Sequence, residues 1–172
     1  MAFNISDFKS RLNSGGARAN LFDVQVANPF GGDDKFTFTC KAAQLPASTM
    51  GLVETFYFGR QVKMAGDRTF AEWTVTILND EDFTVRDALE RWMNTMNTHR
   101  GNLETAGGLP GYKRDATVNQ YAKDGKKIKS YTFEGLFPTE ISTIDLDWST
   151  NDAIEEFTVT FQYDLWTANT TS

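Results

Sequence analysis

The sequence predicts a mainly β domain, a sandwich or barrel-like curled sheet, with one α-helix packed against the sheets. Two stretches alternate apolar and polar residues, as strands with one buried face do: Trp73 to Ile77, and Glu155 to Trp166. Residues 81–99 instead repeat apolar residues at the spacing of an amphipathic helix. We therefore expect roughly eight strands and a single long helix.

One domain is expected over residues 1–172, because a chain of this length buries roughly two-thirds of its unfolded surface. Apolar residues make up 40% of the chain, and 14 Phe supply a core. The 4 Pro are scattered and no repeat or low-complexity tract is present, so no linker is predicted. The apolar runs are far too short to span a membrane, and Met1–Leu12 is too polar for a signal peptide. We therefore expect a soluble chain made in a cytosol, with no membrane partner.

The first part of the chain predicts an arm and then two strands. Residues 1–19 form the arm, in which Ser6 caps a short helix; the arm either docks on a neighbouring subunit or frays. A strand is expected from Leu21 to Ala27. A second strand is expected over residues 36–42, with three residues facing inward: Phe36, Phe38 and Cys40.

Residues 45–64 predict a projecting loop and a long hairpin around Gly59. Phe56, Tyr57 and Phe58 are consecutive, so they cannot all face one core. The stretch is either a strand buried on both faces or a hairpin whose second face is covered by another copy, and we favour the hairpin. A tight turn is expected after it, at Gly66-Asp67.

The helix over residues 81–99 is expected to start after a cap at Asn79, with acidic residues in its first turn. Gly101 is the expected residue just beyond its end, and a loop follows over residues 101–114. Its apolar stripe consists of Val85, Ala88, Leu89, Trp92, Met93 and Met96.

The remainder of the chain predicts four strands. Ala116 to Tyr121 is the first, and Asp124-Gly125 predicts a two-residue hairpin turn into the second, Ile128 to Leu136. The third runs from Ile141 to Trp148, with an irregularity near residue 142. The fourth, Glu155 to Trp166, has an apolar face that consists of Phe157, Val159, Phe161, Tyr163 and Leu165.

The charge distribution disfavours nucleic-acid binding. The formal net charge is -6, every Lys and Arg lies at or before Lys129, and the stretch from Ser130 to Ser172 holds eight acidic residues and no basic ones. Such a segment repels a phosphate backbone. Four lysines surround the Asp124-Gly125 turn without interleaved aromatic residues, so we interpret the turn as a solvated hairpin tip: Lys123, Lys126, Lys127 and Lys129.

The sequence predicts no catalytic, cofactor or metal site. Cys40 is the only cysteine, and we expect a buried, inert thiol. His99 is the only histidine, and its expected role is a cation in the last turn of the helix. The GGLPGYK stretch lacks the spacing of a phosphate-binding loop. The acids Asp145, Asp147 and Asp152 lack the glycine and the closing glutamate of a calcium loop.

The stretch VKMAGDRTFAEWTVTILNDE, Val62 to Glu81, resembles a motif of the tail tube proteins of contractile-tailed bacteriophages. Further segments occur in that family's order: ARANLFDVQV, FTCKAAQLPA, YKRDATVNQYAKDG, FEGLFPTEI and LDWSTNDAIEEFTVTFQYDLW. Together they cover nearly the whole chain. One departure is Ala19, where the family often has Pro, and it bears on the backbone that enters the first strand.

The resemblance implies a structural virion protein with the tail tube fold. In that family six copies form a ring, and rings stack into a tube that conducts the genome into the host. The implied partners are further copies, the tail sheath, baseplate and tail-terminator proteins, and DNA that passes through the lumen without specific binding. The implied location is the virion tail, after assembly in the host cytoplasm. The lumen is implied to be lined by strands of all six copies, and no residue is assigned to it.

We assign the axial contact between rings to the hairpin region 45–64, supported by the arm and the loop from Gly107 to Gly111. The expected subunit-interface residues are Leu45, Pro46, Met50, Val53, Phe56, Phe58, Arg60, Leu109 and Tyr112.

Two other functions remain open at this point. The chain resembles, in architecture, tubes of type VI secretion and of phage-derived injection devices, which deliver protein. A ligand-binding β-sandwich, such as a carbohydrate-binding module, would instead use exposed aromatic residues such as Tyr57, Tyr112 or Trp166.

Overall fold

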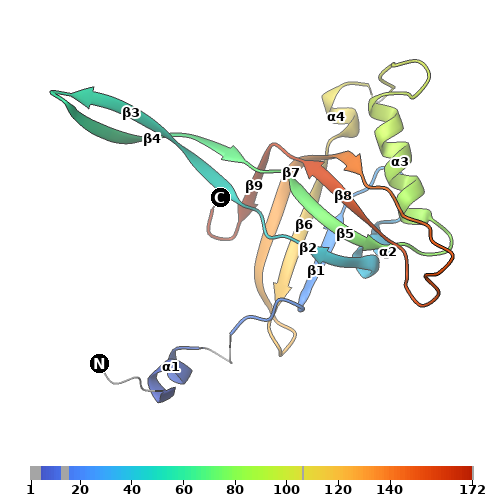
Figure 1. Cartoon of the computed structure of the whole chain (residues 1–172), viewed down its shortest axis with the longest axis horizontal. Helices are drawn as coiled ribbons and strands as arrows, with labels where there is room; N and C mark the ends of the chain where they lie inside the picture. Colours follow the sequence, from blue (N-terminus) through green and yellow to red (C-terminus); the bar gives the residue numbers. More distant parts are fainter. Residues whose placement is uncertain (1–4, 13–15, 106, 172) are drawn as a thin grey trace.

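The computed structural model describes residues 5–12, 16–105 and 107–171. Within them, seven antiparallel strands form the sheet of the body, and a separate two-stranded hairpin projects from it (Figure 1). The strand order is β1-β6-β7-β8-β5-β2, and β9 pairs with β7. The strands are Phe22–Val26 (β1), Cys40–Ala43 (β2), Trp73–Leu78 (β5), Arg114–Tyr121 (β6), Lys127–Ile141 (β7), Glu156–Gln162 (β8) and Leu165–Ala168 (β9). The predicted mainly β fold is confirmed, and the sheet does not close into a barrel.

The core side of the sheet follows the predicted alternation. Trp73, Val75 and Ile77 of β5 are almost completely buried, whereas the threonines between them are half-buried. Trp73 lies opposite Phe161 of β8 and stacks on Phe133 of β7, with 4.5 Å between the ring centroids. These aromatic residues fill the centre of one continuous core.

Strand β7 belongs to both halves of the sheet. Its first part pairs with β6 on one side and, from Tyr131 to Glu134, with β9 on the other. Its last part, from Phe137 to Ile141, pairs with β8. Between them Gly135 has a φ of 69°, which a residue with a Cβ rarely adopts. The strand therefore passes from one half of the sheet to the other through this glycine.

Helix α3 (Thr84–Met96) buries the predicted stripe: Val85, Ala88, Leu89 and Trp92 are buried, and Met93 and Met96 are half-buried.

The ends of α3 differ from the prediction. Its N-cap position is Phe83, and Oδ1 of Asp82 accepts the backbone N–H of Thr84; the side chain of Asn79 instead donates to Glu155. The helix ends at Met96 with Asn97 as its C-cap, so His99 lies outside its last turn and Gly101 is not the residue just beyond its end.

Residues 36–42 were expected to form a strand, and this expectation is wrong. Helix α2 (Asp33–Thr39) occupies most of the segment, and β2 begins only at Cys40. Gly32 precedes the helix with a φ of 84°, and Thr37 donates its hydroxyl to the carbonyl of Asp33, four residues earlier. Phe36 is buried as predicted, but Phe38 points away from the core and is 87% exposed.

The strand expected from Ile141 to Trp148 is also wrong beyond its first residue. β7 ends at Ile141, and residues 142–155 run as a loop in which Leu146 and Trp148 are exposed. Asp147 turns the chain by accepting the backbone N–H of Ser149. The last alternation is likewise interrupted, because β8 ends at Gln162 and Asp164 donates its backbone N–H to Glu134.

The short helix α1 (Ile5–Arg11) lies apart from the sheet (Figure 1). It begins before Ser6, so Ser6 is not its cap. The other predictions for residues 1–4 and 13–15 lie outside the described residues. In the described ranges 5–12, 16–105 and 107–171, each helix is too short or too polar to cross a membrane.

Candidate subunit interface

The projecting hairpin consists of β3 (Ser48–Tyr57) and β4 (Arg60–Phe70). Phe58 and Gly59 form its tip, with φ values of 46° and 78°. Two consecutive positive φ values are typical of the type I′ turn that joins two twisted strands. The hairpin predicted around Gly59 is therefore present, and it extends beyond the predicted stretch to Phe70.

The two faces of the hairpin differ in polarity. On one face Val53 lies opposite Met64, and Val62 lies opposite Thr55, so that most of its side chains are apolar. On the other face Glu54 lies opposite Lys63, with 3.9 Å between their charged atoms, and two apolar side chains flank this pair: Leu52 and Phe56.

A β-bulge replaces the turn that was expected at Gly66-Asp67. Between Met50 and Leu52 the register shifts, because β4 has one residue more than β3 at this point. A Cβ on Gly66 would lie 3.1 Å from the carbonyl carbon of Gly51, which is closer than most real Cβ contacts. The strands approach this closely because both positions are glycine.

Two tryptophans of the body anchor the segment that leads into the hairpin. The indole Nε1–H of Trp73 donates to the carbonyl oxygen of Gln44 at 2.8 Å, and that of Trp166 donates to Ala47 at 3.3 Å. On the other strand, the ring of Phe70 packs edge-on against Trp166, with 6.4 Å between centroids. The base of the hairpin is therefore fixed to the sheet, while its length extends away from it.

The hairpin lacks the support that two-stranded ribbons need. Every residue of β3 is exposed, including Phe56 at 75%. An isolated two-stranded hairpin is marginally stable in water, and large exposed apolar patches mark interaction surfaces. Exposed apolar strands of this kind are typical of surfaces that another molecule covers.

The structure places most of the predicted interface residues on or beside this hairpin. Leu45 and Pro46 precede it, and five others belong to it or its tip: Met50, Val53, Phe56, Phe58 and Arg60. Tyr112 ends the short helix α4 (Leu109–Tyr112) and is half-buried, with its ring edge-on to Phe137. The side chain of Leu109 lies outside the described part of the chain. The interface role of all these residues stays a prediction.

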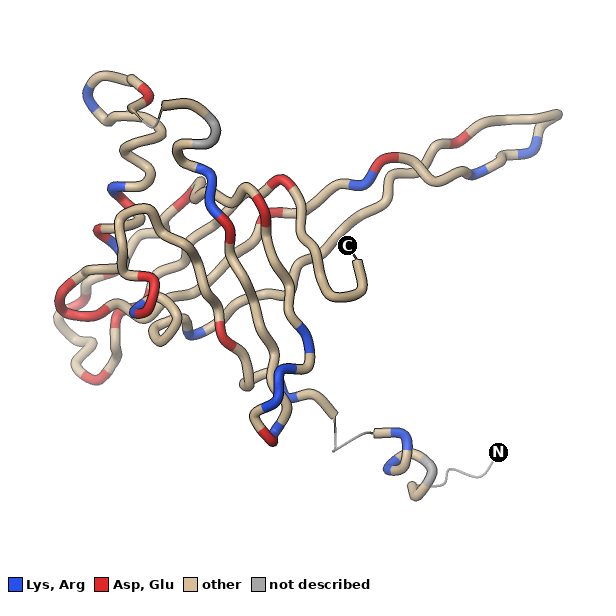
Figure 2. Tube along the Cα trace, turned by 180° about the vertical axis from the view of Figure 1, so that it is seen from behind, with Lys and Arg blue, Asp and Glu red and all other residues tan. Residues whose placement is uncertain are grey.

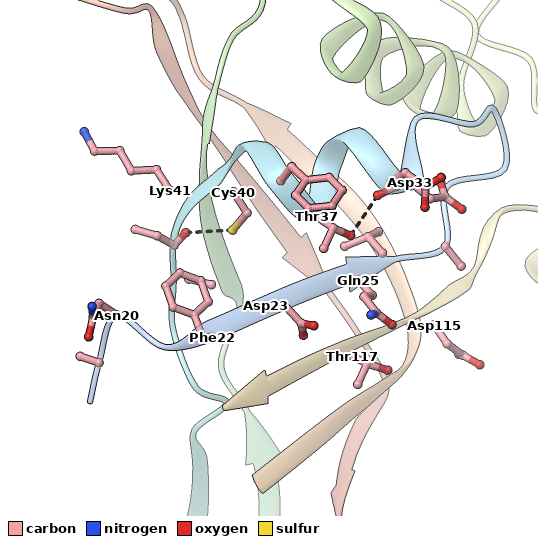
Figure 3. Close-up of a pocket in the computed structure, with 17 residues that line it drawn as sticks. Asn20, Phe22, Asp23, Gln25, Asp33, Thr37, Cys40, Lys41, Asp115 and Thr117 are labelled. Carbon is pink, nitrogen blue, oxygen red and sulfur yellow. Dashed lines mark hydrogen bonds between the residues drawn. The ribbon is translucent and has the colours of Figure 1, made fainter. Parts of the chain in front are cut away.

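An open groove of about 1350 Å³ lies between strand β1 and the α2–β2 segment (Figure 3). Its apolar lining includes Phe22 and Phe38, and its acidic lining is Asp23, Asp33, Asp34 and Asp115. β1 and β2 are the two ends of the strand order, so the groove is the place where the sheet fails to close.

The sequence did not indicate this groove. It depends on α2, which was expected to be a strand, and on β1 and β2 lying at the two ends of the strand order. The only sequence signal was the aromatic residue Phe38, which was predicted to be buried.

Charges are segregated on the surface (Figure 2). The loop 142–155 carries Asp145, Asp147 and Asp152 beside the exposed Trp148. The β6–β7 turn carries the predicted lysines, of which Lys126 lies 3.4 Å from Asp124. The turn is solvated as expected.

The titratable groups are in ordinary structural environments. Cys40 is half-buried rather than fully buried, and desolvation raises the pKa of its thiol to about 12. Hydrogen bonds from Lys35 lower the pKa values of Asp80 and Asp82, that of Asp82 to about 2. Among the described residues, no group of His, Cys, Asp and Glu side chains could hold a metal ion.

A profile of the phage tail tube protein family matches residues 5–169, which is nearly the whole chain. The chain belongs to the phage tail tube family. Tail tube protein gp19 of Enterobacteria phage T4 is 39% identical over 166 residues, covering 96% of this chain and 94% of the relative. The tail tube protein of Serratia phage KSP90 is 23% identical over 166 residues, covering 92% and 93%.

Solved structures show the same tube fold. A chain of the PVC extracellular contractile injection system, from its sheath–tube complex, has a TM-score of 0.63 at 17% identity, and the match covers 98% of this chain and 99% of that chain. A chain of the anti-feeding prophage baseplate has a TM-score of 0.67 at 13% identity, covering 91% and 97%. Hcp1 from E. coli EAEC 042 has a TM-score of 0.51 at 11% identity, covering 90% and 96%. This tail tube protein thus shares its architecture with the tubes of injection systems, although its sequence is much more similar to that of the T4 tail tube protein.

Proposed function

We propose that the chain polymerises as stacked hexameric rings into the inner tube of a contractile phage tail and forms the conduit for genome ejection. Membership of the tail tube family supports the tube, and the 39% identity to the T4 protein supports a phage tail. The chain is a virion component, assembled in the host cytoplasm. We assign it no catalytic role and no cofactor.

The observation that carries this proposal is the hairpin β3–β4, which has exposed apolar side chains on both faces. A neighbouring copy would cover it, and we assign to it the axial contact between rings. The edges of β1 and β2, which bound the groove, support a second contact between copies, because exposed strand edges are normally covered. A head-to-tail contact that closes after six copies gives a ring, and an axial contact stacks the rings.

The proposed partners follow from the position of a tail tube. The sheath, baseplate and terminator surround or end the tube, and the structures with this fold come from sheath–tube, terminator and baseplate assemblies of injection systems. DNA passes through the lumen without specific binding.

We propose that the wall of the conduit is the polar face of β5 and β8, where Thr76 pairs with Thr158. Uncharged hydroxyl and amide groups offer no cation to DNA phosphates, so DNA would not be held by counterion release. Thr76→Lys should slow genome delivery from intact tubes. Normal delivery by this variant would contradict the non-stick wall.

The experiment that tests the main proposal is negative-stain microscopy of the purified protein, alone and with baseplate as a seed. We expect rings or tubes from the unaltered chain. Phe56→Ser should abolish the tubes and leave a folded monomer, whereas the matched control Leu103→Ser, at an exposed apolar site away from the hairpin, should form tubes normally. A chain that stays monomeric under all these conditions would contradict the proposal.

A tube that delivers protein is the second candidate, because the solved structures with this fold include injection systems. Their identities of 13–17% support the fold alone, and neighbouring genes would distinguish the two cargoes.

A ligand-binding module has less support. Trp166 is half-buried and bonded to Ala47, and Tyr112 packs against the core, so only Tyr57 of the three expected aromatic residues is freely exposed.

A further inference from the structure

Helix α1 presents an apolar stripe to solvent. Ile5, Phe8 and Leu12 are spaced as neighbours on one side of a helix, and they are 70%, 67% and 40% exposed. Lys9 and Arg11 lie in its last turn. A seven-residue helix is too short to be stable in water on its own, so its order depends on a surface that covers the stripe.

The groove between β1 and α2–β2 has the complementary character. Its floor includes Phe22, and its wall includes the almost fully exposed Phe38. The acidic side chains around it include Asp34 and Asp115, both exposed. Its one cationic side chain among the described lining residues, Lys41, is already paired with Glu156.

We propose that this groove receives helix α1 of a second copy of the chain. The apolar stripe would lie on Phe22 and Phe38, and Lys9 and Arg11 would face the carboxylates at the rim. This is the mode in which an amphipathic helix docks in an apolar groove. The volume of about 1350 Å³ is ample for the three apolar side chains of two helical turns. The inference rests on the proposed polymerisation, for which it names the acceptor surface of the arm.

A second copy fits better than the arm's own body. Ala19 and Asn20 line the end of the groove, so the chain leaves the body there (Figures 1 and 3). Helix α1 lies clear of its own groove (Figure 1). Docking of the arm in a second copy, which we call arm exchange, adds a contact to each subunit. Docking in its own groove would instead require the chain to reverse direction at the end of the groove.

Cross-linking between two differently tagged proteins tests the exchange. One carries Phe8→Cys and the other Phe38→Cys, both with Cys40→Ala, and a short bismaleimide joins thiols that lie close together. We expect a product that contains both tags, at least about tenfold more abundant than with the control pair Phe8→Cys and Leu103→Cys. The inference is overturned if the product that carries both tags is no more abundant than with the control pair. It is also overturned if a protein with both Phe8→Cys and Phe38→Cys cross-links only within one chain.

Charge exchange tests the contact without removing Cys40. Lys9→Glu with Arg11→Glu should raise the protein concentration needed for assembly about tenfold, and adding Asp34→Lys should recover part of that loss. An unchanged concentration for the doubly acidic variant, or no recovery with Asp34→Lys, overturns the inference. Normal tubes without cross-links would leave the proposed tube function intact, whereas cross-linked copies that never form tubes would contradict the function and support the arm exchange.

Discussion

Replacing Gly135 by Ala probes the bend at which β7 passes between the two halves of the sheet. The φ of 69° costs a residue with a Cβ about 1–2 kcal/mol. The added Cβ would also lie 2.8 Å from Cγ and 3.4 Å from Cβ of Asp164, whose side chain pairs with Lys113 at 2.6 Å. Moving Asp164 away gives up that half-exposed ion pair, which contributes up to about 1 kcal/mol.

We therefore expect Gly135→Ala to lower the free energy of unfolding by about 2–3 kcal/mol, measured by urea denaturation of the unpolymerised protein with tryptophan fluorescence. Gly125→Ala is the matched control, because Gly125 has a φ of 80° and no atom within 4 Å of the added Cβ. It should lose only the backbone strain, about 1–2 kcal/mol.

A double-mutant cycle separates the two contributions. Asp164→Ala alone should cost at most about 1 kcal/mol, and the combination with Gly135→Ala should cost no more than Gly135→Ala alone, because the ion pair can be lost only once. Strictly additive costs, or equal costs for Gly135→Ala and Gly125→Ala, would refute the role of Asp164.

Three further predictions concern single contacts. Hydrogen bonding to Lys35 lowers the pKa of Asp82 to about 2, so this carboxylate contributes stability at neutral pH that is lost as the pH falls from about 4 through 2. An NMR titration of Asp82 should show its inflection near pH 2, and Lys35→Met should raise the pKa of Asp82. The raised pKa of Cys40, about 12, keeps the thiol protonated, so a maleimide at pH 8 should label it far more slowly than it labels urea-unfolded protein; equal rates would contradict this. Gly66→Val should crowd Gly51 and prevent tube formation. The free energy of unfolding of the monomer should stay within about 0.5 kcal/mol of the original, because the hairpin packs on little of the body; normal tubes would refute the prediction.

The sequence correctly predicted those elements of the body in which burial of one face alone determines the spacing of the apolar residues. Trp73 and Ile77 alternate with threonine because one face of β5 is in the core, and Trp92 repeats at helical spacing because α3 covers that core. Phe36 and Phe38 alternate in the same way but belong to a helix. There the local signals of Gly32 and the acidic first turn determined the structure, and the apolar alternation was accidental.

The candidate interface was predictable only in part. Three consecutive aromatic residues ending at Phe58 cannot share one core, and together with the family resemblance this favoured a projecting hairpin over a strand buried on both faces. The bulge at Gly66 was mistaken for a turn, because glycine followed by aspartate is common in both and only the register with Gly51 distinguishes them. The groove beside Phe38 depends on which strands end up at the two edges of the sheet, and a single sequence does not contain that information.

The continuity of β7 has a mechanical consequence. Its fifteen residues run unbroken through both halves of the sheet, so relative sliding of the halves must stretch or unpair a covalently connected backbone. Ladders of hydrogen bonds on both sides of the strand would share that load, and shear applied to one half of a subunit would reach the other half directly. The body of the subunit gains stiffness from this single shared strand, in which Gly135 marks the bend between its two parts.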